Sequence, residues 1–301
     1  MNAPSPRAAQ QVDDAALHAW PLPLPDHDGD KETRGRVVIV AGGREVPGAA
    51  ILSARAALRA GAGKVLLATG ESVAMAIAMA VPELRVLGLR ETAEGGLDPT
   101  CAEQLEKFAE CANALLIGPG MQDEDATGAL AQALRQRCEH VPMVLDATAM
   151  AAALQQPTER QPVLITPHAG EMAHLSGDSK ESVLADPQTA ACTAARRWNA
   201  VVALKGATTF IARPDGRAWV HDAGNAGLAT AGSGDVLAGL IAGFVARGAA
   251  LEQAAAWGVA VHARAGRRLA ARVGSLGYLA SELAAEVPAV LDQLSGTAVD
   301  P

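Results

Sequence analysis

Apolar and polar residues follow two alternating patterns along the chain. Short apolar runs typical of buried strands are separated by segments in which apolar residues recur every three or four positions, as in helices. The short runs predict strands at 36–43, 64–69, 84–89, 113–117, 142–146, 162–165 and 200–205. The other segments predict helices at 48–60, 71–80, 99–110, 123–138, 148–154, 187–198, 233–247, 250–271 and 279–293.

Strands that alternate with helices at this spacing are typical of βαβ units. They predict an α/β fold in which a mostly parallel sheet is covered by helices on both faces. The segment 205–222 differs, because two strand-like runs flank the turn Pro214-Asp215-Gly216, which predicts a hairpin extension. Residues 1–30, rich in Pro, Ala and Asp, are expected to form a flexible tail in which 15–20 packs on the body, and 31–301 a single domain.

The composition excludes several classes of protein. Half of the residues are hydrophobic, enough for a large core, and the net charge of −8 argues against a general nucleic-acid binder. The chain contains neither a long apolar run typical of a membrane span nor an N-terminus typical of a signal peptide. The four cysteines form no CxxC pair, so we expect reduced, structural thiols in a cytoplasmic protein that does not contact membranes.

The segment 224–248 carries the clearest candidate chemistry. Its second half is an apolar helix, which Ser233 is expected to cap, and small residues precede it. Bare N–H groups of Gly232, Ser233 and Gly234 at the positive end of a helix dipole can bind an anion such as phosphate. Asp235, in the first turn, could act as a base beside that anion. Alternatively, Asp235 only balances the helix dipole and the glycines only form a tight turn.

Further polar residues follow the predicted strands, and ligands of parallel sheets gather at the carboxyl ends of strands. Lys205, before a glycine, could hold a nucleotide phosphate or be an exposed strand end. His168 could face a ligand or only begin a helix, and Asp146 could contact a ligand or metal-bound water or only cap the next segment. These alternatives stay open on the residues alone.

Three motifs are superficial matches. The GAGK at 61–64 lacks the earlier glycine and the Ser or Thr of a P-loop, and reads as the end of a helix. The AGGREVPG at 41–48 has the wrong spacing for a dinucleotide fingerprint. His168, Glu171 and His174 do not have the HExxH spacing of a zinc site.

Taken together, the motifs resemble those of the ADP/ATP-dependent NAD(P)H-hydrate dehydratases of the ribokinase-like superfamily. The resemblance covers about 31–293, and its most specific parts are NAGLATAGSGDVLAG (225–239), TPHAGE (166–171), LKGATT (204–209), GPG (118–120) and the lead-in Lys31 and Gly35. It implies a three-layer α/β/α sandwich. It also implies an enzyme that phosphorylates the ring hydroxyl of the S-form of hydrated NADH or NADPH from ADP or ATP, with Mg²⁺, and eliminates phosphate to restore the cofactor.

The resemblance also implies roles for individual residues. Asp235 would be the catalytic base, which we expect to be weak at a helix N-terminus, and Gly232, Ser233 and Gly234 would form the anion hole. No protein side chain is expected to bind the metal directly. The nucleotide would be bound by Lys205, Gly206, Ala207, Thr208, Thr209 and Gly234. The hydrated cofactor would be bound by Ala49, Ala50, Gly120, His168 and Asp235, with Asp146 and Asn225 as further candidates.

The sequence departs from the family pattern at several positions. Ala226 replaces a proline and Ala231 a glycine, a change that is tolerable unless residue 231 needs a positive φ. Thr148, Ala151 and Gln122 replace a carboxylate, an amide and a glycine on the substrate side. The epimerase domain often fused ahead of this one is absent from the sequence given, so a separate epimerase would supply that step. The family resemblance also suggests a homo-oligomer, a tetramer.

Two other functions are compatible with the same residues. A ribokinase-like kinase of a small alcohol or vitamin precursor would share the anion hole and the base. A non-catalytic nucleotide-binding protein would have lost its chemistry through the departures described above.

Overall fold

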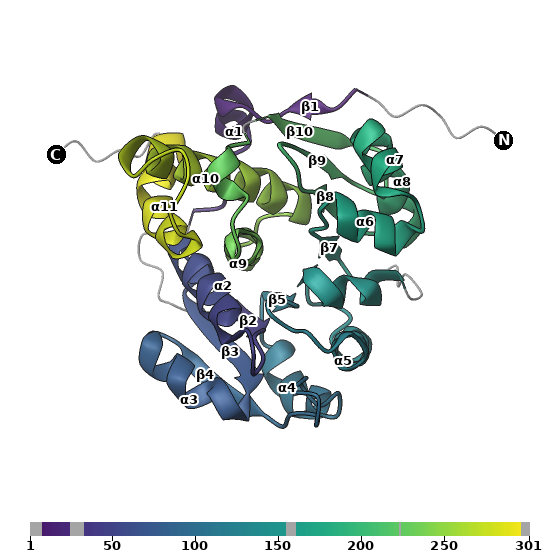
Figure 1. Cartoon of the computed structure of the whole chain (residues 1–301), viewed down its shortest axis with the longest axis vertical. Helices are drawn as coiled ribbons and strands as arrows, with labels where there is room; N and C mark the ends of the chain where they lie inside the picture. The colour runs from purple at the N-terminus through teal and green to yellow at the C-terminus, as the bar shows by residue number, and fades with distance from the viewer. Residues whose placement is uncertain (1–7, 25–32, 155–160, 223, 296–301) are drawn as a thin grey trace.

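One sheet organises the chain. The computed structural model describes residues 8–24, 33–154, 161–222 and 224–295. Ten strands lie in the order β1-β10-β9-β8-β7-β6-β5-β2-β3-β4 (Figure 1). Their bounds are β1 Gln10–Gln11, β2 Arg36–Val40, β3 Lys64–Gly70, β4 Arg85–Leu89, β5 Ala114–Ile117, β6 Met143–Leu145, β7 Val163–Ile165, β8 Val201–Leu204, β9 Thr208–Ala212 and β10 Ala218–Asp222.

The seven neighbouring strands β8, β7, β6, β5, β2, β3 and β4 pair in parallel, in this order across the sheet. The alternation of strands and helices predicts this. The strand β9 runs antiparallel to both β8 and β10, which confirms the hairpin predicted at 205–222. Gly216 has a φ of 88° in its turn, a conformation that glycine adopts without strain. All the parallel carboxyl ends therefore meet at one edge of the sheet.

Helices connect the strands and cover both faces of the sheet (Figure 1). They are α1 Asp14–Ala19, α2 Pro47–Arg59, α3 Glu71–Ala80, α4 Cys101–Ala109, α5 Glu124–Arg137, α6 Ala169–Ser176, α7 Lys180–Ala185, α8 Pro187–Trp198, α9 Ser233–Ala246, α10 Leu251–Arg272 and α11 Ala280–Ser295. Two 3₁₀ helices, η1 Ala147–Leu154 and η2 Ala226–Leu228, complete the described elements.

Two hydrophobic cores lie on opposite faces of the sheet, because successive strand side chains point to opposite sides. Val37 and Ile39 of β2 pack in the core that contains α2, α9, α10 and α11. Val38 and Val40 pack in the other core, with α4, α5 and α8. The expected three layers are therefore confirmed.

Helix α9 is the central helix of the first core and lies against α2. A Cβ atom at Gly239 would lie 2.2 Å from the carbonyl oxygen of Ser53. A Cβ atom at Gly243 would lie 2.8 Å from the carbonyl oxygen of Ala57. The two glycines therefore bring the backbones of α9 and α2 closer together than any larger residue allows.

The described part of the N-terminal segment is more ordered than the expected tail. Leu17 of α1 is buried, and the ring of Trp20 stacks on Trp219 with centroids 5.6 Å apart. The carbonyl of Trp20 accepts hydrogen bonds from Gln253 and Trp257. The expected packing of 15–20 on the body is thus confirmed, and the prediction of a loose tail is wrong only for the other residues of 8–24, where β1 pairs with β10 and Leu22 is buried. Residues 1–7, 25–30 and Lys31 lie outside the described residues.

The cysteines are free, and three of them, Cys101, Cys138 and Cys192, are buried. Burial raises the pKa of the Cys138 thiol to about 11, which keeps it protonated and unreactive. Within the described ranges, none of the helices combines the length and the apolar character that crossing a membrane requires.

Candidate active site

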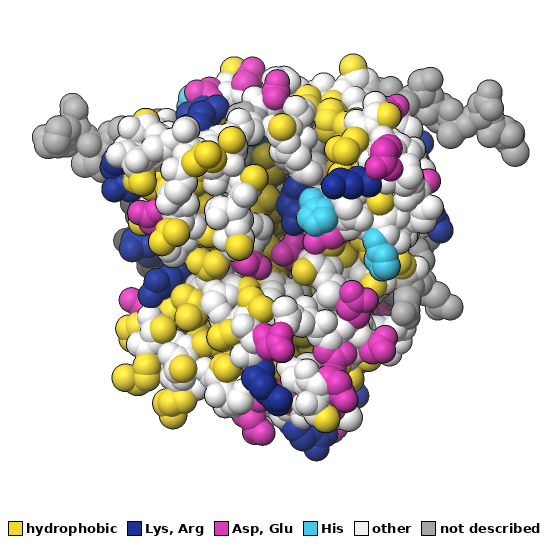
Figure 2. Space-filling view, viewed as in Figure 1, with side chains coloured by type: hydrophobic (Ala, Val, Ile, Leu, Met, Phe, Trp, Pro, Cys, Tyr) yellow, Lys and Arg dark blue, Asp and Glu magenta, His cyan; other side chains and the backbone are white. Residues whose placement is uncertain are grey.

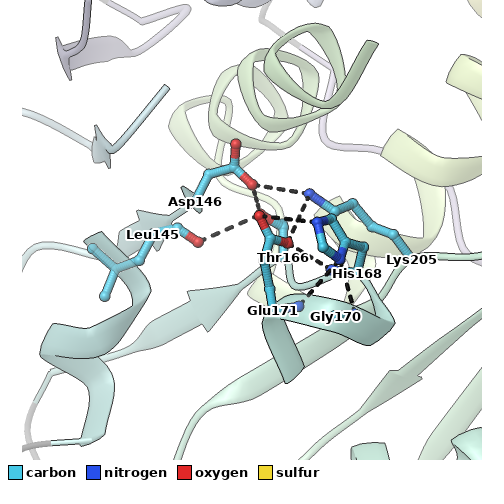
Figure 3. Close-up of polar contacts among 7 residues, drawn as sticks. All are labelled: Leu145, Asp146, Thr166, His168, Gly170, Glu171 and Lys205. Carbon is cyan, nitrogen blue, oxygen red and sulfur yellow. Dashed lines mark hydrogen bonds and ion pairs between the residues drawn. The ribbon is translucent and has the colours of Figure 1, made fainter. Parts of the chain in front are cut away.

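The predicted site residues from three neighbouring strands meet at the carboxyl edge of the sheet (Figure 3). Asp146 follows β6, Thr166 and His168 follow β7, and Lys205 follows β8. The loop before α9 approaches the same place, since a Cβ atom at Gly234 would lie 3.6 Å from Lys205 Nζ. The fold therefore brings the predicted anion site, lysine and carboxylates together.

The loop before α9 differs in one detail from the prediction. Gly232, with a φ of 86°, is the N-cap residue, and Ser233 is the first residue of the helix. The Ser233 hydroxyl lies 3.0 Å from His262 Nε2, so it is occupied by the neighbouring helix α10 instead of capping α9. The prediction that Ser233 caps the helix is wrong because only glycine fits the left-handed cap position without strain.

The N–H groups of this loop are not equivalent. The Ser233 amide donates to the carbonyl of Thr230 at 3.2 Å. The prediction that this amide is a free donor for an anion is therefore wrong. Within the part of the chain that the structure describes, the amides of Gly232 and Gly234 have no such acceptor. Ala231, which replaces a family glycine, does not have a positive φ, so its methyl group introduces no backbone strain.

Lys205 is the centre of a network of charges. Its Nζ lies 3.1 Å from Asp146 Oδ1 and 3.8 Å from Glu171 Oε2 (Figure 3). Burial disfavours the charged ammonium, but the carboxylates of Asp146, Glu171 and Asp235 outweigh it and raise the pKa of Lys205. The lysine is therefore charged at neutral pH and ready to bind an anion.

Close backbone and side-chain contacts fix the loop that carries Asp146. Thr166 Oγ1 donates to Asp146 Oδ1 at 2.5 Å, and both residues are buried. Ala147 has a φ of 49°, which is uncommon for a residue with a side chain. A Cβ atom at Gly118 would lie 1.8 Å from the Asp146 carbonyl oxygen, so glycine is required there. These contacts hold the Asp146 carboxylate beside Lys205.

Asp235 is a stronger base than the sequence suggests. Burial, followed by the nearby carboxylate of Asp146, raises its pKa to about 6, while Lys205 acts in the opposite direction. The expectation of a weak base considered only the helix dipole, and desolvation outweighs it here. A carboxylate with this pKa is ionised at pH 7 and suited to accept a proton.

His168 begins α6 and has a defined tautomer. Its Nδ1 accepts hydrogen bonds from the amides of Gly170 and Glu171, at 3.0 and 3.1 Å. Glu171 completes a capping box by accepting from the His168 amide at 2.7 Å. Because Nδ1 is an acceptor, the neutral ring carries its hydrogen on Nε2. His168 is thus both a helix cap and an exposed donor at the edge of the site.

A cavity of about 720 Å³ opens beside Lys205 and α9. Figure 2 shows a hollow on this face, with charged and histidine side chains at its rim. Most of the predicted nucleotide-binding residues line the cavity, namely Lys205, Gly206, Ala207, Thr209 and Gly234. His168 and Asn225, predicted to bind the cofactor, line it too. Thr208 does not line it, because its hydroxyl bonds Asp222 on β10 at 3.1 Å.

The predicted substrate residues at the start of α2 form a second group. Ala49 and Ala50 are buried, and a Cβ atom at Gly120 would lie 2.6 Å from Ala49 Cβ. Gly42 also packs on this turn, since its Cβ atom would lie 3.0 Å from Ala50 Cβ. Ala49 is 3% and Ala50 0% exposed, backbone included, so neither presents a surface to a ligand in this structure.

Several residues of the site were not singled out from the sequence. Thr166 lies inside the TPHAGE motif, but its hydrogen bond to Asp146 depends on the fold. Glu171 was considered only as part of a zinc-like spacing, although its position three residues after His168 is that of a capping box. His262 lies in the middle of the long helix α10, and burial lowers its pKa to about 4. The hydroxyl of Tyr278 donates to Asn225 Oδ1 at 3.2 Å and fixes the loop before α9.

The acidic side chains fit a Mg²⁺ ion that is bound mainly by a nucleotide. Among the described residues, no three His, Cys, Asp or Glu side chains are grouped so that they could hold a metal by themselves. Asp146 and Asp235 nevertheless interact electrostatically beside Lys205. Carboxylate oxygens together with phosphate oxygens and water are the ligands that Mg²⁺ prefers.

The sequence and the fold are similar to those of known proteins. The family model described as NAD(P)H-hydrate dehydratase matches residues 37–289. A relative from Xanthomonas campestris pv. campestris, the ADP-dependent (S)-NAD(P)H-hydrate dehydratase, is 50% identical over 280 residues, which are 93% of this chain and 95% of that protein. The chain belongs to the NAD(P)H-hydrate dehydratase family.

Other members of the family differ in length. The bifunctional NAD(P)H-hydrate repair enzyme Nnr of Moorella thermoacetica is 40% identical over 278 residues, and the chain spans 52% of its length. The crystal structure of the Bacillus subtilis ADP/ATP-dependent NAD(P)H-hydrate dehydratase, co-crystallised with ATP/Mg²⁺, has a TM-score of 0.83 and 28% identity, and the match covers 95% of this chain and 99% of that one. The expected ribokinase-like fold is thereby confirmed.

Proposed function

We propose that this member of the NAD(P)H-hydrate dehydratase family is an ADP-dependent (S)-NAD(P)H-hydrate dehydratase. The observation that carries the proposal is that Lys205 and Gly234 lie together on the cavity wall and that the next residue, Asp235, has a pKa raised to about 6 and interacts electrostatically with Lys205. The relative with this activity, 50% identical over almost the full length of both chains, supports the same conclusion. The protein would return hydrated NADH or NADPH to the reduced cofactor.

The first step is transfer of a phosphoryl group to the ring hydroxyl. The hydroxyl oxygen forms a bond to the terminal phosphorus of the nucleotide, the bond from that phosphorus to the remaining nucleotide breaks, and Asp235 accepts the hydroxyl proton. The amides of Gly232 and Gly234 stabilise the transferring group, and Lys205 neutralises its charge. Ser233 would contribute by holding this loop against His262.

The second step is elimination. Phosphate leaves with the electron pair of its carbon–oxygen bond, and the neighbouring ring carbon loses a proton, so the ring double bond forms again. Phosphate is a far better leaving group than hydroxide, which explains why the reaction consumes a nucleotide.

The nucleotide would occupy the cavity. Lys205, Gly206, Ala207, Thr209 and Gly234 line it, and Thr208 would support the wall through Asp222. Mg²⁺, bound to the nucleotide phosphates near the carboxylates, would offset the charge between phosphate oxygens and the attacking group.

The hydrated cofactor would approach from the α2 side. Gly120 would form the wall there, with Ala49 and Ala50 packed behind it, and His168, Asp146 and Asn225 would lie nearer the reacting ring. We also propose that a separate epimerase is a partner of this protein and converts the R-form. We also propose a cytoplasmic homotetramer; light scattering in solution tests the tetramer.

The test uses purified protein, the S-form of hydrated NADH, ADP and Mg²⁺. We expect absorbance at 340 nm to return, because the reduced nicotinamide ring is restored. If ADP is consumed without this absorbance, the protein is a kinase that stops at the phosphate ester. If nucleotide binds and neither change occurs, the protein is a binding module; Asp235→Asn, which should bind nucleotide without turnover, is the control.

A further inference from the structure

Glu171 contacts two residues of the cavity wall to which the proposed function gives different ligands. Its Oε2 lies 3.8 Å from Lys205 Nζ, on the nucleotide side, and accepts from the His168 amide at 2.7 Å. Its Oε1 lies 3.6 Å from Nε2 of the His168 ring, which lines the same cavity as Lys205 and which the proposed function assigns to the cofactor (Figure 3). One carboxylate is thus shared between a cation that would bind phosphate and a ring that would bind the second substrate.

The His168 ring is held at one nitrogen only. Two backbone amides bind Nδ1, which leaves the hydrogen on Nε2 pointing toward Glu171. A separation of 3.6 Å is too long for a good hydrogen bond. The side chain is also 59% exposed, so the Nε2 end of the ring is not packed as the Nδ1 end is held. A shorter contact with Glu171 would fix its orientation.

The charge on Glu171 is divided between two partners. Around Lys205 lie three carboxylates, those of Asp146, Glu171 and Asp235, and a single ammonium cannot satisfy all of them. A nucleotide phosphate bound to Lys205 would draw the ammonium away from Glu171. Besides the His168 amide, which Glu171 already accepts from, the nearby donor is the Nε2–H of His168, so the contact between Glu171 and this ring nitrogen should shorten.

We propose that Glu171 is a positioning residue that couples nucleotide binding at Lys205 to the orientation of the His168 ring. The inference deepens the proposed function and rests on its assignment of the two binding sides. It means that nucleotide raises the affinity for the reduced dinucleotide, and that the dinucleotide raises the affinity for nucleotide by the same factor. We expect a factor of about five to ten, at the lower end of common couplings.

The experiment compares NADH binding with and without saturating Mg·ADP by isothermal titration calorimetry. NADH lacks the ring hydroxyl, so no turnover disturbs the measurement. In the wild type we expect the five- to tenfold tightening. In Glu171→Gln the amide oxygen can still accept from the His168 amide, but the negative charge is gone, so we expect the ratio of the two affinities to fall close to one.

Glu282 provides a matched control. It accepts from the Leu279 amide at 2.7 Å in the first turn of α11, the same capping geometry, and it does not line the cavity. Glu282→Gln should lose a similar amount of thermal stability and keep the wild-type ratio. If Glu171 is only a helix cap, Glu171→Gln will behave like this control, with a lower melting temperature and an unchanged ratio.

The outcomes separate the two proposals. If the wild type dehydrates hydrated NADH but shows no coupling, or if Glu171→Gln keeps it, the coupling role is refuted and the proposed function stands. If the wild type has no dehydratase activity and Glu171 still controls the coupling between ADP and NADH, only the proposed function fails.

Discussion

Asp235→Asn should slow the proposed catalysis strongly and, at the same time, stabilise the protein. The Asp235 carboxylate is half-buried, and burial together with Asp146 raises its pKa from 3.8 to about 6. A carboxylate with a raised pKa favours the folded state only while it is protonated. This contribution is complete below pH 3.8 and is lost as the pH rises through 6. At neutral pH the ionised group therefore opposes folding.

The magnitude follows from the size of the shift. A change in pKa from 3.8 to about 6 corresponds to about 3 kcal/mol at high pH. Asparagine has no charge to desolvate, but it also loses the favourable interaction with the helix N-terminus, about 0.3–1 kcal/mol. We expect a net gain in the free energy of unfolding of about 2 kcal/mol at pH 8 and none at pH 4, measured by urea denaturation of both proteins.

A matched variant isolates the effect of burial. Asp125 lies in the first turn of α5 and is exposed, so Asp125→Asn loses only the interaction with the helix dipole. That variant should be slightly less stable than the wild type at pH 8. Should Asp235→Asn show no stabilisation at pH 8 relative to pH 4, the carboxylate is not desolvated and the argument for its strength as a base is refuted.

Two further predictions follow from the same geometry. The value of kcat/KM should decrease as the pH is lowered through about 6, because protonated Asp235 cannot accept the hydroxyl proton, and a flat profile from pH 5 to 8 would contradict this. In the same assay the activity of Asp235→Asn should be lower than that of the wild type by about 10²–10⁴. Tyr278→Phe removes the donor to Asn225 and should lower the free energy of unfolding by about 1 kcal/mol in urea denaturation; a loss of nucleotide affinity would accompany it, because Asn225 lies on the cavity wall.

Much of the fold follows from local patterns. The apolar runs mark the strands of the sheet because buried parallel strands have no polar face, and α8 lies at the predicted residues, 187–198. The segment 148–154 is helical, but it is the 3₁₀ helix η1, since backbone hydrogen-bond register depends on packing. The edge strand β1 has only two residues, and its pairing with β10 leaves no mark in the sequence.

The site was less predictable than the fold. The glycines, Asp146, Lys205 and Asp235 could be found because they follow strands or precede a helix. The raised pKa of Asp235 could not be predicted, because it depends on burial and on the carboxylate of Asp146, which is 89 positions away in the chain. Their roles in binding and catalysis stay predictions until the ligands are tested.

The close packing of α9 on α2 has a consequence for how the reactants meet. One helix starts at Ser233, where the phosphoryl group would rest, and the other at Pro47, where the dinucleotide would lie. The close backbone contacts at Gly239 and Gly243 fix the distance between the N-termini of the two helices. Replacing either glycine by alanine, at a position away from both proposed ligands, would push α9 away from α2. The phosphoryl donor and the ring hydroxyl would then lie too far apart to react.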